Sequence, residues 1–132
     1  MATTTVVWRG GMHFCTRLTS GELMCDESSE VGAAYPSAPE LLMASLGSCV
    51  GSTLVAFAAR RDLDLEGMTI DLDWRLADSP RRIGAIAVRV RLPADLSDEQ
   101  RRTLERVAHS CLIHNTLSHP PQMSLDLVTG ER

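Results

Sequence analysis

The sequence predicts a single α+β domain in which a mostly antiparallel sheet packs on a long central helix. Three observations predict this class: an uncharged stretch over residues 41–59, two alternating segments over 68–76 and 86–92, and a second helical pattern after Ser97. The predicted order is strands, helix, strands, helix, strand. A chain of 132 residues with 44% hydrophobic residues can bury an ordinary core, so we expect one domain over 1–132.

Charge and composition exclude several classes of function. The formal net charge is -4, and acidic and basic residues are interspersed, so no basic stripe is available to bind nucleic acid. The first residues, MATTTVVWRGG, lack both a basic leader and a long apolar run, which favours a cytoplasmic protein. In that compartment the four cysteines are expected to stay reduced, as catalytic or metal-binding groups rather than structural disulfides. No cofactor motif is present.

The N-terminal residues predict a strand followed by a hairpin. The segments TTTVVWRG, MHFCTRL and ELMCD alternate, with a turn over residues 19–21. If the turn is a three-residue loop with Gly21 in the left-handed region, Cys15 and Cys25 fall opposite each other. Two free thiols are expected there, because a cytosolic disulfide is unusual.

The central helix is predicted from Ser37, with Pro39 just inside its start, to about Arg60. Its uncharged stretch approaches the length of a membrane span. Glycine, serine, threonine and alanine make it only weakly hydrophobic, so we expect a buried core helix and no membrane partner. Gly47 and Gly51 share one face, which predicts the close approach of another backbone.

The second half of the chain predicts two strands, a helix and a closing strand. Residues of the strands alternate about a turn over 78–80, and a capping box of Ser97 and Gln100 opens the helix. Cys111 follows the apolar spacing of this helix and should face the core. The apolar faces are Met68, Ile70, Leu72, Trp74 and Leu76, then Ile86, Val88, Val90 and Leu92, then Leu104, Val107 and Ala108, and finally Met123, Leu125 and Leu127 of the closing strand.

Cys49 and Cys111 are the candidate functional residues. Each lies on the apolar face of a predicted helix, and the two helices must pack in one small core. One interpretation is a two-cysteine redox site, and the alternative is that Cys49 is an inert buried side chain, the common fate of a free cysteine. Burial alone raises a thiol pKa, so a reactive Cys49 needs an activating cation. Arg9 and Arg17, on or beside the first strands, are the candidates.

A metal site is the other chemistry considered. His109, Cys111 and His114 are clustered in the sequence. Their spacing does not match paired zinc ligands, and a single helix does not direct three such side chains at one ion. We therefore expect no metal.

Several segments together resemble the family of the osmotically inducible protein C and the organic hydroperoxide resistance protein. They are PELLMASLGSCVGSTL, the strands after LDLEGM, the pair Arg82 and Ile83, the helix after LSDEQ, and CLIHNTL. The resemblance covers about residues 5–128. It implies an OsmC-like fold in an intertwined homodimer, with a peroxidatic cysteine on the central helix and a second cysteine at the end of the other helix.

By this resemblance the protein is a peroxidase that reduces organic hydroperoxides. Cys49 attacks the peroxide as a thiolate, becomes a sulfenic acid and condenses with Cys111, and an external dithiol, lipoyl-type in one branch, reduces the disulfide. An arginine and a glutamate flank the cysteine in active members. Pro39 occupies the position of the family's glutamate in this sequence. The candidate is therefore the next residue, Glu40, which lies about 100° further around the helix. The rival interpretation is a non-enzymatic member that binds a small molecule or senses oxidants through Cys49.

Overall fold

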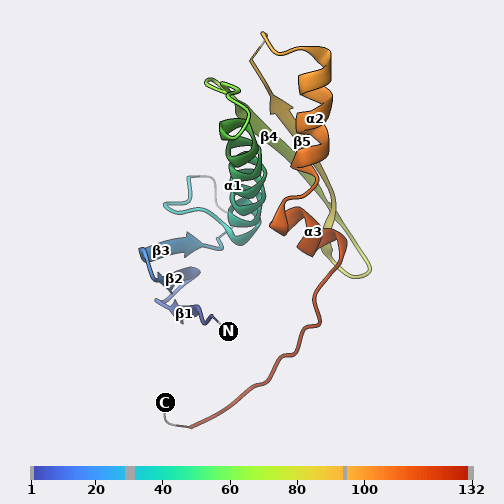
Figure 1. The fold of residues 1–132 in the computed structure, drawn as a ribbon. Coiled ribbons are helices and arrows are strands. Elements are labelled where there is room, and N and C mark those ends of the chain that lie inside the picture. The colour runs from blue at the N-terminus through green and yellow to red at the C-terminus, as the bar shows by residue number, and fades with distance from the viewer. Residues whose placement is uncertain (1, 29–31, 94, 131–132) are drawn as a thin grey trace.

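The computed structural model describes residues 2–28, 32–93 and 95–130 and confirms the α+β class (Figure 1). In the described residues the strands form two antiparallel sheets, one of three strands and one of two. The elements in chain order are β1 (Thr5–Trp8), β2 (His13–Leu18), β3 (Gly21–Asp26), α1 (Ala38–Ala59), β4 (Thr69–Ala77), β5 (Arg82–Arg91), α2 (Asp98–Ala108) and α3 (Leu112–Ser118).

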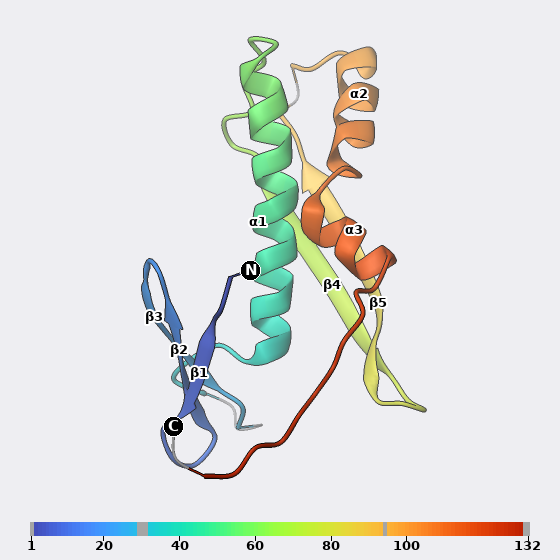
Figure 2. The same cartoon turned by 60° about the horizontal axis from the view of Figure 1, so that its bottom comes forward.

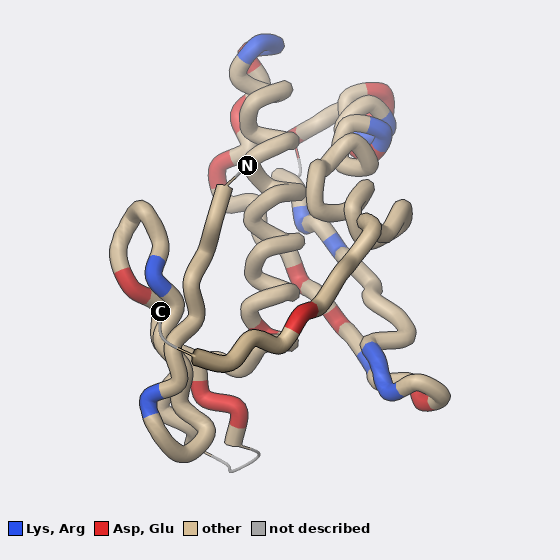
Figure 3. Tube along the Cα trace, turned by 90° about the horizontal axis from the view of Figure 1, so that it is seen from below, with Lys and Arg blue, Asp and Glu red and all other residues tan. Residues whose placement is uncertain are grey.

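Helix α1 has the predicted bounds because its first turn is fully capped. Ser37 is the N-cap, and its side chain and that of Glu40 form a reciprocal capping box, while Arg60 is the C-cap. One face of α1 packs on β4, α2 and α3, and it buries Leu46, Val50 and Leu54 in the core. The whole stretch after Glu40 carries no charge, as Figure 3 shows. The helix therefore forms the centre of the molecule.

By length and composition alone, α1 could also cross a membrane, as could many core helices of soluble proteins. A third of its most apolar window is buried inside the described structure.

The two glycines of α1 allow strand β4 to approach closely. A Cβ built at Gly47 would lie 2.9 Å from Leu72 Cδ1, and one at Gly51 would lie 3.2 Å from Ile70 Cδ1. The sequence predicted a neighbouring backbone at this face. The structure corrects this: the neighbours are the inward side chains of β4, which need the space because they are branched.

The N-terminal sheet has a different register from the predicted one. The hairpin closes with a two-residue turn, because Leu18 pairs with Gly21, and as a result Cys15 pairs with Met24 while Cys25 pairs with Phe14. A shift of one residue turns a side chain to the other face of a sheet. Cys15 and Cys25 are therefore both buried but on opposite faces, and the predicted opposition of the two thiols is wrong.

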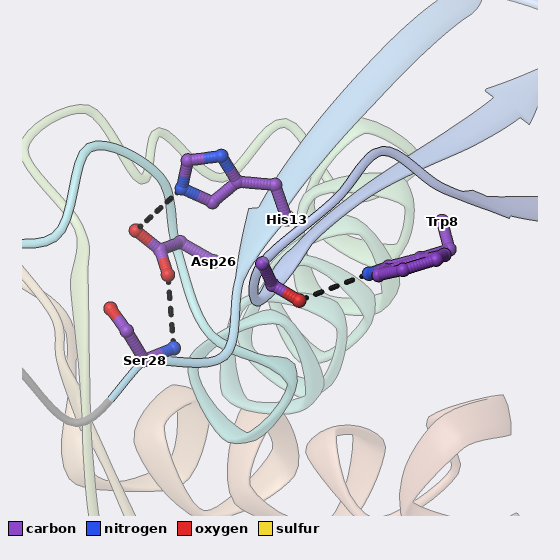
Figure 4. Close-up of polar contacts among 5 residues, drawn as sticks. Trp8, His13, Asp26 and Ser28 are labelled. Atoms are coloured by element: carbon purple, nitrogen blue, oxygen red, sulfur yellow. Dashed lines mark hydrogen bonds and ion pairs between the residues drawn. The ribbon is translucent and has the colours of Figure 1, made fainter.

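A polar cluster fastens this sheet to the loop before α1. His13 Nε2 lies 3.3 Å from Asp26 Oδ2, and Asp26 Oδ1 accepts the Ser28 backbone N–H at 2.9 Å (Figure 4). The Ser28 N–H is the main cause that lowers the pKa of the buried Asp26 carboxyl. On β1, Trp8 donates its indole N–H to the Gly11 carbonyl at 3.0 Å.

The C-terminal segment does not form the predicted strand. Residues 120–129 are extended but unpaired, and they run away from α3 (Figures 1 and 2). Met123, Leu125 and Leu127 were expected to face inward, but they are 85%, 85% and 93% exposed. A strand needs a partner edge for its backbone groups, and among the described residues of this one chain the segment has none.

Candidate active site

Cys49 and Cys111 meet where α3 packs on the middle of α1. Cys49 is half-buried on α1, at a helix position next to Leu46 and Val50. Cys111 is fully buried, with 0% exposure. The sequence placed Cys111 within the second helix, but α2 ends at Ala108 and the chain then turns into a third helix. Cys111 is the N-cap of α3, which the apolar spacing alone could not distinguish from a continued helix.

As an N-cap, Cys111 is held by its own helix. Its sulfur accepts the backbone N–H of His114 at 3.4 Å, and its backbone is extended. Serine and aspartate are the usual residues here, and a thiol accepts more weakly. The contact nevertheless fixes the Cys111 sulfur in a defined position beneath Cys49.

The environment makes Cys49 the more acidic of the two thiols. The Cys111 thiol faces it as a hydrogen-bond donor and is the largest cause that lowers the pKa of Cys49. The backbone N–H groups of Ile113 and Leu112 lower this pKa further, against the effect of burial. The pKa of Cys111 is shifted in the opposite direction. Burial is the main cause that raises it, and the neighbouring Cys49 raises it further.

Two hydroxyl groups support α1 beside Cys49. Thr53 Oγ1 donates to the Cys49 carbonyl at 2.8 Å, and Ser52 Oγ donates to the same oxygen at 3.0 Å. The Thr53 side chain also contributes to the lowered pKa of Cys49. The helical spacing places Thr53 on the same stripe as Cys49 but predicts only packing for it. Its position four residues after Cys49, one turn along the helix, is the signal that could have identified it.

The site can therefore form and trap an oxidised sulfur. A thiolate is the nucleophilic form of cysteine, and Cys49 is the thiol biased toward it. Cys111 stays protonated and adjacent, so it can donate a proton and then attack an oxidised Cys49. The exposure of the two cysteines fits this order of reaction. The oxidant can reach the partly exposed Cys49 sulfur, whereas the fully buried Cys111 sulfur can react only with Cys49.

The other candidate residues lie away from the thiol pair in this chain. Glu40 is occupied in the capping box, where its Oε1 accepts the Ser37 N–H at 3.3 Å. It lies nine residues before Cys49, which places it on the opposite side of α1 and about 13 Å along the axis. Arg9, directly after β1, and Arg17, on β2, are both exposed. In the described part of the chain, neither arginine is among the groups that shift the Cys49 pKa.

A large, mainly apolar cavity lies beside α1, and neither Cys49 nor Cys111 is among the residues that line it. It has a volume of about 1260 Å³ and lies between α1, β5, α2 and α3. Its walls are mainly aliphatic side chains, with two histidines that pack edge to face, their ring centroids 5.4 Å apart. Among its lining residues are Leu46, Val50, Ile86, Val88, His109 and His114.

The clustered histidines do not form a metal centre with the thiols. Across the described ranges, no group of three or more His, Cys, Asp or Glu side chains is placed to hold an ion. His109 caps the end of α2, Cys111 caps the start of α3 and His114 lies within α3. The sequence analysis assumed that all three residues lie on one helix. In the structure they lie at the end of one helix, at the start of the next and within it.

The α+β fold with a half-buried cysteine on the central helix next to a fully buried one can be compared with known proteins. The chain belongs to the OsmC-like protein family, whose model matches residues 31–126. No curated protein matches the sequence.

Solved structures share this fold at low sequence identity. An OsmC-like protein from Mycoplasma pneumoniae is 15% identical, with a TM-score of 0.80 over 89% of this chain and 87% of its own. The organic hydroperoxide resistance protein OsmC of Legionella pneumophila is 22% identical, with a TM-score of 0.68 over 89% and 90%. The organic hydroperoxide resistance protein OhrB of Bacillus subtilis is also 22% identical, with a TM-score of 0.68 over 90% and 93%. At these identities the likeness shows the fold.

Proposed function

We propose that the protein is a cytoplasmic thiol peroxidase that reduces organic hydroperoxides through Cys49 and Cys111. The observation that carries the proposal is that the pKa values of two adjacent thiols are shifted in opposite directions. The pKa of Cys49 is lowered, and that of Cys111 is raised. Membership of the OsmC-like family and the hydroperoxide-resistance proteins among the structural neighbours support the same activity.

The proposed reaction uses each thiol once. The Cys49 thiolate attacks the terminal oxygen of the hydroperoxide, the O–O bond breaks, and the alcohol leaves, so that Cys49 becomes a sulfenic acid. The Cys111 sulfur then displaces water and forms the disulfide. A dithiol of the lipoyl type restores both thiols by exchange. The apolar cavity lined by Leu46 and Val50, the helix neighbours of Cys49, would hold the organic part of the peroxide.

A second copy of the chain completes this proposal. Glu40 lies on the far side of its own α1 from Cys49, Arg9 directly follows β1, and Arg17 lies on β2. In a homodimer these groups can serve the neighbouring protomer: one of the arginines stabilises the thiolate, and Glu40 orients that arginine. No nucleic acid and no membrane has a part in the proposal.

The test is intact-mass analysis of the reduced protein after one equivalent of cumene hydroperoxide, followed by turnover with a dithiol. We expect a loss of two hydrogens in the wild type, located by peptide mapping to a disulfide between Cys49 and Cys111. Cys49→Ser should be unreactive, and Cys111→Ser should stop at a gain of one oxygen. A Cys15 to Cys25 product would refute the assigned pair. Oxidation without turnover would favour a thiol sensor or binding protein.

A further inference from the structure

Thr53 places a hydroxyl group beside the side chain of Cys49. It is half-buried on α1, one turn after Cys49, and its Oγ1 donates to the Cys49 carbonyl at 2.8 Å. Because the side chains of an α-helix lean toward the preceding turn, the Thr53 hydroxyl lies over Cys49. The same hydroxyl is one of the groups that lower the pKa of Cys49. Its single hydrogen therefore has two acceptors, the carbonyl oxygen and the sulfur.

The Cys49 carbonyl does not depend on this hydrogen. It also accepts the Ser52 hydroxyl at 3.0 Å, and it lies inside α1, where a carbonyl accepts the backbone N–H four residues later. A hydrogen bond to a charged acceptor is roughly twice as strong as one between neutral groups. Rotation about the Cβ–Oγ1 bond moves only the hydrogen. The charge on the Cys49 sulfur therefore decides which acceptor the hydroxyl serves.

We propose that Thr53 is a positioning residue of the site, whose hydroxyl turns its hydrogen from the Cys49 carbonyl to the Cys49 sulfur when the thiolate forms. This inference rests on the proposed peroxidase function and deepens it. The hydrogen stays bonded to Oγ1, so no proton is transferred. The other donors to this sulfur come from Cys111, Leu112 and Ile113, and Cys111 ceases to be a donor when it attacks. Thr53 belongs to the same helix as Cys49, so its contribution does not depend on the position of α3.

The experiment compares Thr53→Val, which replaces the hydroxyl with a methyl group, with Thr53→Ser, which keeps the hydroxyl. The matched control is Thr103→Val on α2, because Thr103 is also half-buried and donates to the carbonyl four residues earlier, that of Glu99, at 3.0 Å. The measurement is the rate of Cys49 alkylation by iodoacetamide between pH 6 and pH 10, with Cys49 identified by peptide mapping. We expect Thr53→Val to move the midpoint to higher pH and to slow alkylation at pH 7 by about threefold. Thr53→Ser and Thr103→Val should match the wild type.

The shape of the pH profile separates this role from structural damage. Above the midpoint Cys49 is ionised in every variant, so Thr53→Val should react there at least as fast as the wild type, because a thiolate of higher pKa is the stronger nucleophile. An unchanged profile in Thr53→Val, slower alkylation at every pH, or an equal loss in Thr53→Ser would overturn the role of the hydroxyl. Thr53→Ala is measured in parallel in case the valine variant fails to fold.

The single-turnover oxidation by cumene hydroperoxide tests the link to the reaction. Its rate at pH 7 should fall in Thr53→Val by a factor similar to that of alkylation, because both reactions need the thiolate. A peroxide rate that stays at the wild-type value while alkylation slows would show that Thr53 has no part in the reaction with peroxide. A wild type that is alkylated at Cys49 but not oxidised would instead refute the proposed function.

Discussion

At the scale of single residues, the site depends on one thiol that acts as a donor to another. Cys111 is fixed by the N–H of His114 and is fully buried, so it remains protonated next to Cys49. The backbone N–H groups of Leu112 and Ile113 add to its effect on the Cys49 pKa. A short turn between two helices thus supplies hydrogen-bond donors that favour the thiolate, to which the proposed homodimer adds an arginine.

Removal of this donor should make Cys49 less reactive. Cys111→Ala takes away the largest cause of the lowered pKa, so that pKa should rise and alkylation of Cys49 at pH 7 should slow by roughly threefold to tenfold. Cys111→Ser keeps an O–H donor and should lose less. The measurement is the pH dependence of iodoacetamide alkylation, with Cys49 identified by peptide mapping. A lower midpoint pH in Cys111→Ala than in the wild type would contradict the arrangement.

At the scale of the elements, the sequence predicted what local patterns determine. The capping residues Ser37 and Ser97 and the alternation of β4 and β5 were sufficient for these elements. The hairpin register was not predictable, because a two-residue and a three-residue turn fit the same residues over 19–21. Similarly, the break before Cys111 leaves the apolar spacing unchanged, so α3 could not be separated from α2 in the sequence.

The packing of α1 on β4 predicts that its two glycines differ in their tolerance of substitution. Alanine gains up to about 1 kcal/mol in helix propensity over glycine. At Gly47 the new methyl group would stand 2.9 Å from Leu72 Cδ1, and overpacking of this kind costs about 1–3 kcal/mol. Gly47→Ala should therefore destabilise the protein by about 1 kcal/mol, and Gly51→Ala, at 3.2 Å from Ile70 Cδ1, should be near neutral. Urea unfolding of both variants measures the difference, and the reverse order would show that Leu72 moves aside freely.

At the scale of the whole molecule, one chain leaves too much surface uncovered. Its accessible surface is 10476 Å², whereas a compact monomer of 14.4 kDa exposes about 6,800 Å². The uncovered part includes Val6 and Trp8 on β1, 58% and 66% exposed, and the apolar C-terminal segment. Trp74 and Leu76, at the far end of β4, are 38% and 47% exposed although they belong to its predicted inward face.

This exposure bears on one failed prediction, the inward face of the C-terminal segment. The activation of Cys49 by an arginine stays a prediction. The C-terminal segment runs away from α3 and pairs with no described strand of its own chain (Figures 1 and 2). A periodic pattern indicates that a face will be buried but not which chain will bury it. The uncovered apolar side chains of this segment thus support the proposed homodimer.

The last prediction concerns the C-terminal segment, which should lose its exposure in that homodimer. If Leu125 and Leu127 face a second copy, Leu125→Asp with Leu127→Asp should produce a monomer, because two buried unpaired carboxylates would cost several kcal/mol. The matched control places the same two charges at Gln122 and Ser124, which lie on the other face of the alternating segment. Sedimentation at micromolar concentration should show a dimer for the wild type and the control and a monomer for the leucine variant. If the dimer also completes the active site, peroxide turnover should fall in the monomer, while the Cys49 thiol, whose main donor comes from its own chain, stays readily alkylated. A monomeric wild type, or a leucine variant that remains dimeric, would show that the segment is free in solution.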